Sequence, residues 1–457
     1  MSQRIADASF VDEPITDREQ LIEFFREGCK GENDQRVGVE FEKIGVHAQS
    51  GHAIPYHGEY GVEGVFSRLC ERFGWEPIIE QGATVALRRG RELITLEPGG
   101  QVEYTMPPER YLSTIGRMIE QHLAELNAVG EGEVRWLGLG MQPLSRATEI
   151  ERVPKQRYDV MAAYLPTRGA RALQMMMQTA SVQVSLDFHS EEDAIFKLRL
   201  AQALSPILIG IFANSSISEG APNGYRSLRG AIWRETDPDR CGLIPQIFAE
   251  GADFQSYTAY ALDVPMFFVF RNETYIPTGG MTFRQFLEGG GFEGFTPHIS
   301  DWELHLTTIF TEARLKRFVE FRCADTLPMP YLLSIPALYK GICYTQRALE
   351  AAWDLVAHIP VARLDRLLDL VPRMGLETPV APGSTLRELA QELVRIARGG
   401  LEAQIERDPG NAADLEYLEP IESLVCETCR SHADRILEEW NGPWQGDLGR
   451  LLEACSY

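Results

Sequence analysis

The sequence has little positive charge for its length, and this shortage limits the partners it can have. Its 457 residues include 44 lysine and arginine residues against 66 aspartate and glutamate residues, which gives a formal net charge of −22 at pH 7. A surface with this balance repels phosphate backbones and anionic lipid headgroups. We therefore expect neither nucleic acid nor a membrane as the main partner.

Long apolar runs are also missing. The longest ones, such as 207–213 and 266–270, are far shorter than the ~20 residues that a membrane-spanning helix needs. The N-terminal segment 1–7 has no apolar core of the kind found in a signal peptide. The overall composition, 44% apolar and 24% charged, is that of a globular chain. These features predict a soluble, cytoplasmic protein.

The eight cysteines are too few and too scattered for a disulfide scaffold. Cys426, Cys429 and His432 form the one cluster, and their spacing of three would place them along one helix face, where they could contact a metal. No fourth ligand is apparent. We therefore favour reduced thiols on an ordinary helix over a zinc site.

Several common catalytic and nucleotide-binding motifs are absent. There is no phosphate-binding loop with its lysine, no complete dinucleotide fingerprint around Gly138-Leu139-Gly140, no Gly-x-Ser-x-Gly elbow and no His-Glu-x-x-His pair. We interpret His305, on an apolar helix face, as a core residue rather than a catalytic base. The chemistry must therefore be sought in other patterns.

Alternation and turn signals predict an α+β fold with a mainly antiparallel sheet, because strands and helices do not alternate regularly along the chain. Helices are expected over 17–29 with Thr16 as N-cap, over 110–128, from a Ser190 cap to about Leu204 before Pro206, and through much of 346–457. Strands are expected over Val37–Glu42, Leu93–Glu97, Val102–Met106, Ser181–Phe188 and Arg317–Arg322, with a turn at Pro98-Gly99-Gly100 and a long loop over 213–245.

The predicted strands share an apolar face suited to a core and an opposite face rich in carboxylates, amides or arginine. The polar side chains are Glu40 and Glu42, Glu97 and Glu103 around the turn, Gln183, Ser185 and Asp187, and finally Glu320 and Arg322. For any single strand, the simpler interpretation is a sheet face in contact with solvent. However, glutamate is depleted in strands, and glutamates gathered on one face repel each other unless a cation lies between them. Because Mg²⁺ prefers oxygen ligands and keeps positions for phosphate oxygens, the pattern indicates a Mg-nucleotide site.

The long loop supplies charge of the opposite sign. Arg226, Arg229 and Arg240 lie within fifteen residues of each other, and arginine binds carboxylate or phosphate through two parallel hydrogen bonds. A solvated basic loop is the alternative interpretation. The glycine, proline and asparagine residues around the arginines favour close approach to a ligand.

Nine stretches of the sequence form a combined pattern that is more specific than any one of them. They are Val37–Val46, Leu96–Glu103, Tyr164–Gly169, Met175–Phe188, Phe212–Ser215, Asp237–Gly242, Tyr260–Met266, Met281–Arg284 and Asp301–Phe310. In these stretches the sequence resembles the plant and proteobacterial type of glutamate–cysteine ligase, which makes γ-glutamylcysteine for glutathione. The likeness extends from about residue 20 to the region of Trp444.

The resemblance implies a glutamine-synthetase-like fold, in which a curved, mainly antiparallel sheet forms a funnel with helices outside. It implies one catalytic domain over 1–457, with a sheet-rich part at 30–345 and a helical part at 346–457. It implies that ATP phosphorylates the γ-carboxylate of glutamate and that the cysteine amine then attacks the acyl phosphate. The implied cofactors are Mg²⁺ and ATP as co-substrate, and the implied partners are glutamate, cysteine and ATP, with the protein as a monomer or homodimer.

The resemblance also implies roles for individual residues. The metal carboxylates are Glu40, Glu42, Glu97, Glu103 and Glu320, and Gln183 lies beside the metal or the nucleotide. Arg322 contacts the γ-phosphate of the nucleotide, with catalytic assistance from Arg240. Arg229 binds the α-carboxylate of glutamate, and Thr179, Tyr260 and Phe267 belong to the substrate pocket, the last two near cysteine.

Two positions depart from the family pattern. Ser185 stands where the family has Asn, and Phe267 stands where plant members have Tyr, beside the expected cysteine pocket. The regulatory disulfides of plant members have no evident equivalent here. Two other functions stay open: a γ-glutamyl ligase with another acceptor amine or pathway, such as ergothioneine synthesis, and a non-catalytic glutamate- or nucleotide-binding protein on the same scaffold.

Overall fold

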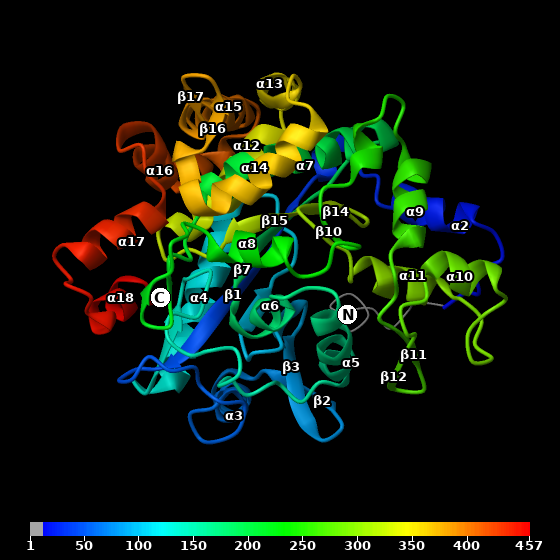
Figure 1. Ribbon diagram of the computed structural model, residues 1–457, viewed down its shortest axis with the longest axis horizontal. Helices are drawn as coiled ribbons and strands as arrows, with labels where there is room; N and C mark the ends of the chain where they lie inside the picture. Colours follow the sequence, from blue (N-terminus) through cyan, green and yellow to red (C-terminus); the bar gives the residue numbers. More distant parts are fainter. Residues whose placement is uncertain (1–11) are drawn as a thin grey trace.

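The computed structural model describes residues 12–457, and a nine-stranded sheet runs through its middle (Figure 1). Eight strands follow the order β14-β15-β7-β1-β5-β4-β3-β2, and β6 pairs separately with β1. Every pair of neighbours in this sheet is antiparallel. The predicted α+β fold with a mainly antiparallel sheet is therefore confirmed, as an open sheet with β14 and β2 at its edges. The strands are β1 (Val37–His47), β2 (Glu76–Glu80), β3 (Ala83–Arg89), β4 (Glu92–Leu96), β5 (Val102–Thr105), β6 (Val134–Leu137), β7 (Ser181–Leu186), β14 (Ala313–Leu315) and β15 (Val319–Asp325).

Helices and short strand pairs surround this sheet. The helices are α2 (Glu19–Arg26), α3 (Val62–Phe73), α4 (Leu112–Gly130), α5 (Gln156–Tyr164), α6 (Ala172–Gln178), α7 (Glu191–Ile211), α8 (Leu228–Arg234), α9 (Phe254–Asp263), α10 (Phe283–Glu288), α11 (Ile299–Leu306), α12 (Ser334–Cys343), α13 (Gln346–Val356), α14 (Val361–Met374), α15 (Leu386–Arg407), α16 (Ala413–Glu422), α17 (His432–Asn441) and α18 (Leu448–Ala454). The short pairs are β8 (Ile217–Ser218) with β9 (Ala221–Pro222), β10 (Cys241–Gly242) with β13 (Phe310–Thr311), β11 (Phe268–Arg271) with β12 (Thr274–Pro277), and β16 (Pro379–Ala381) with β17 (Ser384–Thr385).

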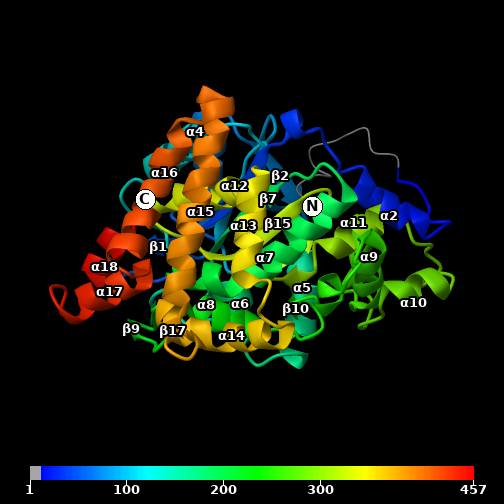
Figure 2. The ribbon, with the colours of Figure 1, turned by 90° about the horizontal axis from the view of Figure 1, so that it is seen from above.

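One face of the sheet is apolar and is covered by helices. Val184 and Leu186 of β7 and Phe321 of β15 are buried, and Tyr339 of α12 stacks on Phe321 with ring centroids 4.5 Å apart. Viewed from above, α12, α13, α15 and α7 lie side by side across this part of the molecule (Figure 2). The hydrophobic core contains these strand residues together with Leu393 of α15. Covering one face with apolar helices leaves the polar side chains on the opposite face.

Helix α7 extends past the point where the sequence predicts its end. Ser190 caps it as expected, with its hydroxyl accepting a hydrogen bond from the Asp193 N–H at 3.2 Å. The helix then continues through Pro206 to Ile211. A proline leaves the carbonyl four residues earlier without its helical donor, and here the Ser205 hydroxyl donates to that carbonyl of Gln202 at 2.5 Å. The predicted end near Leu204 is therefore wrong.

The burial of α7 is also informative. Among the described residues, α7 is the one helix long and apolar enough to cross a membrane by length and composition, yet 89% of its most apolar window is buried inside the protein. It is placed as a core helix.

The predicted loop over 213–245 contains regular structure. Helix α8 lies within it, because the Ser227 hydroxyl accepts from the Gly230 N–H at 3.0 Å and so caps a short run of helical residues. The first helix is shorter than the predicted 17–29, because it runs only from Glu19 to Arg26. The side chain of Asp17, rather than Thr16, accepts a hydrogen bond from its first turn, at the Glu19 N–H. The strand predicted from Arg317 begins two residues later, at Val319.

Helices α12 and α15 cross at a pair of glycines, and this contact gives a test of the packing. A methyl group on Gly400 would lie 1.9 Å from the carbonyl oxygen of Gly341, whereas one on neighbouring Gly399 would meet nothing within 4 Å. We expect Gly400→Ala to lower the free energy of unfolding by about 1–3 kcal/mol or more through overpacking. Gly399→Ala should raise it by about 0.5–1 kcal/mol, because glycine is unfavourable inside a helix. Urea unfolding of both variants measures the difference, and effects of equal sign would contradict the crossing.

Candidate active site

Carboxylates from two strands and an adjoining turn line one cavity of about 160 Å³ on the polar face of the sheet. Antiparallel pairing sets Glu42 of β1 opposite Glu103 of β5, and Glu40 of β1 opposite Gln183 of β7. Residues that face each other across an antiparallel pair project to the same side of the sheet. Glu97, directly after β4, lines the same cavity. The structure therefore brings together four of the five predicted metal carboxylates.

The Pro98-Gly99-Gly100 turn fixes Glu97 at the edge of this cavity. The Gly100 N–H donates to the Glu97 carbonyl at 2.9 Å, and Gly100 has a φ of +80°, which favours glycine. The side chain of Gln101 ties the turn to the end of α6, because its amide donates to the Thr179 carbonyl at 2.9 Å. Thr179 itself lines the cavity, as the resemblance implies.

Burial and mutual repulsion raise the pKa values of Glu40, Glu42 and Glu103. Burial, followed by the charges of Glu97 and Glu103, raises the pKa of Glu42 to about 8. Burial and the charge of Glu103 raise the pKa of Glu40 to about 7, and burial with the charge of Glu97 raises the pKa of Glu103. Carboxylates in this state bind a cation readily, because a cation removes the repulsion between them.

The donor set fits a hard divalent cation such as Mg²⁺, which prefers carboxylate oxygens. In the described part of the chain, no three His, Cys, Asp or Glu side chains are already gathered closely enough around one point to hold an ion. The four glutamates therefore form a carboxylate-lined wall rather than a closed cage, with Glu40, Glu42, Glu97 and Glu103 as its members.

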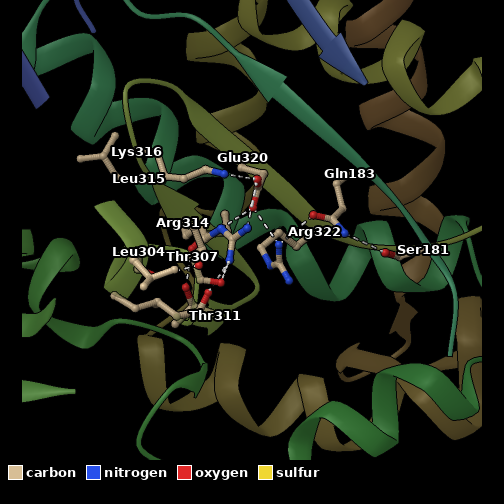
Figure 3. Close-up of polar contacts among 12 residues, drawn as sticks. Ser181, Gln183, Leu304, Thr307, Thr311, Arg314, Leu315, Lys316, Glu320 and Arg322 are labelled. Atoms are coloured by element: carbon tan, nitrogen blue, oxygen red, sulfur yellow. Dashed lines mark hydrogen bonds and ion pairs between the residues drawn. The ribbon is translucent and has the colours of Figure 1, made fainter. Parts of the chain in front are cut away.

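Glu320 has a different environment from the other predicted metal carboxylates. It is completely buried and lies 2.5 Å from Arg314, 2.8 Å from Arg322 and 3.0 Å from Lys316, which surround it in Figure 3. Burial alone would raise its pKa, but these three cations outweigh burial and hold the pKa of Glu320 well below its usual range. Glu320 is therefore already paired with cations and is not among the residues that line the cavity, and its role as a metal ligand stays a prediction.

Gln183 lies between the two charge groups. Its carbonyl oxygen accepts a hydrogen bond from Arg322 at 2.9 Å, and its amide donates to Glu42 at 3.0 Å. Arg322 of β15 and Arg229 of α8 also line the cavity, and in the sheet β7 lies between β15 and the β1 strand that carries Glu40 and Glu42. A cation site and an anion site therefore adjoin each other, which is the arrangement that a metal-bound phosphate requires.

Three predicted residues do not reach the cavity. Arg240 is completely buried, where it pairs with Asp237 at 2.7 Å and donates to the Thr308 and Pro265 carbonyls. Phe267 packs beneath its guanidinium, 3.8 Å from carbon to ring centroid. Tyr260 lies on α9 near the same cluster, with its pKa raised mainly by burial. In this structure the Arg240 guanidinium bonds Asp237 and two carbonyls outside the cavity, and its assistance at the phosphate stays a prediction.

Several cavity residues were not singled out in the sequence. Arg314 and Lys316 alternate with Ala313 and Leu315, so a strand prediction starting earlier than Arg317 would have found them. Lys155 and Arg157, before and within the start of α5, carry no comparable signal.

Lys155 and Arg157 reach the cavity through tertiary contacts. The Val153 N–H donates to the Pro98 carbonyl at 2.9 Å, which sets their segment beside the glutamate turn. Burial and the nearby charge of Arg157 lower the pKa of Lys155 to about 8. Among the described residues, neither side chain is within 4 Å of a carboxylate oxygen, so both can serve an anionic ligand.

A second and larger cavity, of about 480 Å³, adjoins the first one. The two share Glu40, Thr307 and Lys316 in their walls. The larger cavity is lined by apolar side chains such as Leu93, Met106, Phe270 and Phe318, with arginines at 36, 91 and 317. An apolar cavity with a few cations suits a planar base with a charged tail, and its junction with the carboxylates lies at Glu40.

The structure places the singled-out histidines and cysteines. His305 is buried in the core, with its Nε2 2.8 Å from the Ala261 carbonyl, as predicted. His432 begins α17, with its Nδ1 2.8 Å from the Asn214 side-chain oxygen, whereas Cys429, with a φ of +58°, lies between α16 and α17, so the predicted placement of Cys426, Cys429 and His432 along one helix is wrong. All eight cysteines lie in the described part of the chain and are free thiols.

Comparison with protein families gives one match that spans most of the chain. The family model described as "Glutamate-cysteine ligase family 2 (GCS2)" matches residues 36–454. The chloroplastic glutamate–cysteine ligase of Arabidopsis thaliana is 39% identical over 448 residues, which cover 97% of this chain and 84% of that protein. The chloroplastic enzyme of Brassica juncea is 40% identical, with 97% and 85% covered. The resemblance seen in the sequence is confirmed.

Solved structures agree in fold. A glutamate–cysteine ligase of Francisella tularensis, solved in complex with AMP, superposes with a TM-score of 0.53 at 14% identity and covers 92% of this chain and 88% of its own. A bifunctional glutathione synthetase of Pasteurella multocida gives a TM-score of 0.51 at 15% identity, with 95% of this chain and 53% of that chain covered. At these identities the likeness concerns the fold alone.

The raised pKa of Glu42 predicts a pH-dependent stability. Above pH 4.5, the ordinary pKa of a glutamate, the Glu42 carboxyl loses its proton in the unfolded chain but keeps it in the folded protein up to about pH 8. The free energy of unfolding therefore falls as pH rises from 4.5 to about 8. In chelator, Glu42→Gln should therefore gain stability relative to the wild type between pH 5 and pH 8, measured by urea unfolding. At pH 8, Mg²⁺ should stabilise the wild type more than the variant.

Glu120→Gln, at an exposed position on α4, is the matched control. It should show neither the pH-dependent gain nor a changed response to Mg²⁺. A constant difference between Glu42→Gln and the wild type across this pH range would contradict the buried, repelling carboxylates.

Proposed function

The chain belongs to glutamate–cysteine ligase family 2 and is a ligase, and from this premise we propose that it joins the γ-carboxyl of glutamate to the amine of cysteine, with ATP and Mg²⁺. This is the first step of glutathione biosynthesis. The observation that carries the proposal is the cavity itself, where the wall of four glutamates, three of them with raised pKa values, adjoins Arg229 and Arg322. Such a site suits the transfer of a phosphoryl group between two anions.

The reaction proceeds through γ-glutamyl phosphate. The γ-carboxylate oxygen of glutamate attacks the γ-phosphorus of ATP and ADP leaves; the cysteine amine then attacks the acyl carbon, loses a proton, and inorganic phosphate leaves. Phosphoryl transfer needs positioning and charge neutralisation more than covalent help from the protein. When bound by Glu40, Glu42, Glu97 and Glu103, Mg²⁺ would neutralise phosphate charge.

The protein's own cations act on the opposite side of the transferring group. Arg322 lines the cavity and is held by Glu320 and Gln183, so its guanidinium is fixed before any ligand arrives. A preorganised donor stabilises developing negative charge without reorganising during the reaction. Arg314 and Lys316 line the same cavity as Arg322, and Lys316 also lines the larger cavity, to which we assign the nucleotide.

The amino-acid substrates are placed by the remaining cavity cations. Arg229 is assigned to the α-carboxylate of glutamate, with Thr179 beside it in the cavity wall. Lys155 and Arg157 are available for a second carboxylate or phosphate. Phe267 lies behind Phe310, a residue of the cavity wall, with ring centroids 6.2 Å apart. Phe267, which stands where plant members have tyrosine, therefore affects the acceptor pocket indirectly, by packing against the wall residue Phe310.

We further propose a cytoplasmic location, small-molecule substrates as the main partners, and a monomer or homodimer. The free thiols of all eight cysteines and the net charge of −22 support the first two. Another acceptor amine, another pathway and a non-catalytic binding role are the competing functions that the following assay separates.

The direct test supplies purified protein with ATP, Mg²⁺, glutamate and a panel of amines. We expect release of inorganic phosphate and a product with the mass of γ-glutamylcysteine, both dependent on cysteine and on Mg²⁺. Release with alanine or 2-aminobutyrate but not with cysteine would overturn the acceptor assignment. No phosphate release with any amine would favour the non-catalytic role.

Arg322→Met tests the phosphate contact. Loss of a preorganised charged donor should lower kcat by about 100- to 1000-fold. Circular dichroism and thermal unfolding check that the variant is folded. Arg347→Met, at an exposed position on α13, is the control and should keep wild-type kcat. A near-normal kcat in folded Arg322→Met would remove Arg322 from the reaction.

A further inference from the structure

Asp325 is a buried carboxylate that lies behind the cavity rather than in its wall. It is the last residue of β15, only 1% exposed, three residues beyond Arg322. Its side chain accepts hydrogen bonds from the Asn214 N–H at 2.9 Å, the Ser215 hydroxyl at 2.7 Å and the Ser227 hydroxyl at 3.1 Å. A buried carboxylate with this many donors is held in one orientation.

The Gly-Leu-Gly motif at 138–140 makes room for this carboxylate. A methyl group on Gly140 would lie 2.6 Å from both the Cβ and the Cγ of Asp325. The glycine therefore serves a close approach of β15 and the segment after β6, and this contact accounts for a motif that lacks the rest of a dinucleotide fingerprint.

Two serines connect Asp325 to the first turn of α8, the helix that carries Arg229. Ser227 is the N-cap of α8, and its hydroxyl accepts from the Gly230 N–H while donating to Asp325. The Ser215 hydroxyl donates to Asp325 and accepts from the Arg229 N–H at 3.1 Å. The carboxylate therefore fixes both the start of the helix and the backbone of Arg229.

Asp325 also faces the guanidinium itself. The Nη1 of Arg229 lies 3.8 Å from its Oδ1, and in the described part of the chain no other Lys, Arg or His nitrogen comes within 4 Å of this carboxylate. The same guanidinium donates to the Arg322 carbonyl at 2.9 Å and the Cys323 carbonyl at 3.3 Å. Arg229 is thus held from behind by the end of β15, while it also lines the cavity.

We propose that Asp325 is a positioning residue that fixes Arg229 for the α-carboxylate of the amino-acid substrate, so that it sets the affinity for glutamate without touching it. The inference rests on the proposed function, which assigns Arg229 to that carboxylate. The inference predicts an effect on glutamate and not on ATP, because the larger cavity, to which the nucleotide is assigned, is lined by none of the residues that bond Asp325.

The test is Asp325→Asn, which keeps the size of the side chain and removes its charge. We expect the KM for glutamate to rise at least tenfold, the KM for ATP to stay within twofold, and kcat to fall less than the glutamate KM rises. Ser215→Ala, which removes one of the two bridging hydroxyls, should raise the glutamate KM two- to fivefold and covers the case in which Asp325→Asn does not fold. Glutamate-dependent thermal stabilisation in Mg-ADP gives a second readout for each variant.

Asp414→Asn is the matched control. Asp414 is also a fully buried carboxylate with one cation, Lys340 at 2.6 Å, but it lies between α12 and α16, away from the cavity. The Asp414→Asn variant should have a lower melting temperature and unchanged KM values for glutamate and ATP. If the wild type turns over, the proposed function stands. An unchanged KM for glutamate in folded Asp325→Asn and Ser215→Ala would then overturn the inference, and so would equal increases of the KM values for glutamate and ATP. A wild type without turnover overturns the proposed function; if it also shows no stabilisation by glutamate, both fail.

Discussion

The register of β1 with its two neighbours is the constraint on which the site depends. Pairing Glu42 with Glu103 and Glu40 with Gln183 forces these polar side chains onto one face of the sheet, while Val39 and Phe41 enter the core. A shift of one residue would exchange the two sets and bury the carboxylates among the apolar helices. The hydrophobic core therefore fixes the positions of charges that repel each other.

Identical residue types acquire opposite properties on this one sheet face. Glu42 and Glu320 are both buried, yet the pKa of the first is raised by burial and by Glu97, and that of the second is held down by Arg314, Lys316 and Arg322. The first is left needing a cation and the second has its cations already. Roles inferred from residue type alone would treat the two as equal, and their neighbours show that they differ.

The sequence predicts those parts of the site that have a local period. Glu40, Glu42 and Gln183 lie in segments where polar and apolar residues alternate, and the Pro98-Gly99-Gly100 turn marks the position of Glu97. These four residues are therefore recognisable from their spacing. At Pro206, the Ser205 hydroxyl bonds the carbonyl that the proline leaves without its donor, a side-chain detail that helix propensity does not capture.

Tertiary contacts explain the other residues that the sequence did not place. Lys155 and Arg157 reach the cavity through contacts between distant parts of the chain, such as the hydrogen bond from the Val153 N–H to the Pro98 carbonyl. The position of Arg240 outside the cavity has a local cause that spacing alone leaves ambiguous, since Asp237, three residues earlier, is an internal partner for its guanidinium. Both cases turn on which partner a charge finds in the folded chain.

Gln183 explains how opposite charges can share so small a cavity without cancelling. If Arg322 paired directly with Glu42, the guanidinium would be withdrawn from phosphate and the carboxylate from a cation. The neutral amide stands between them and satisfies both, accepting from Arg322 and donating to Glu42. Glu320 holds Arg322 through a 2.8 Å contact to the same guanidinium nitrogen that donates to Gln183. Because Arg314 and Lys316 share this one carboxylate, the group keeps a net positive charge for a phosphate. Glu40, Glu42 and Glu103 consequently keep their raised pKa values, and the capacity to bind a cation and a phosphate side by side is preserved in the folded protein.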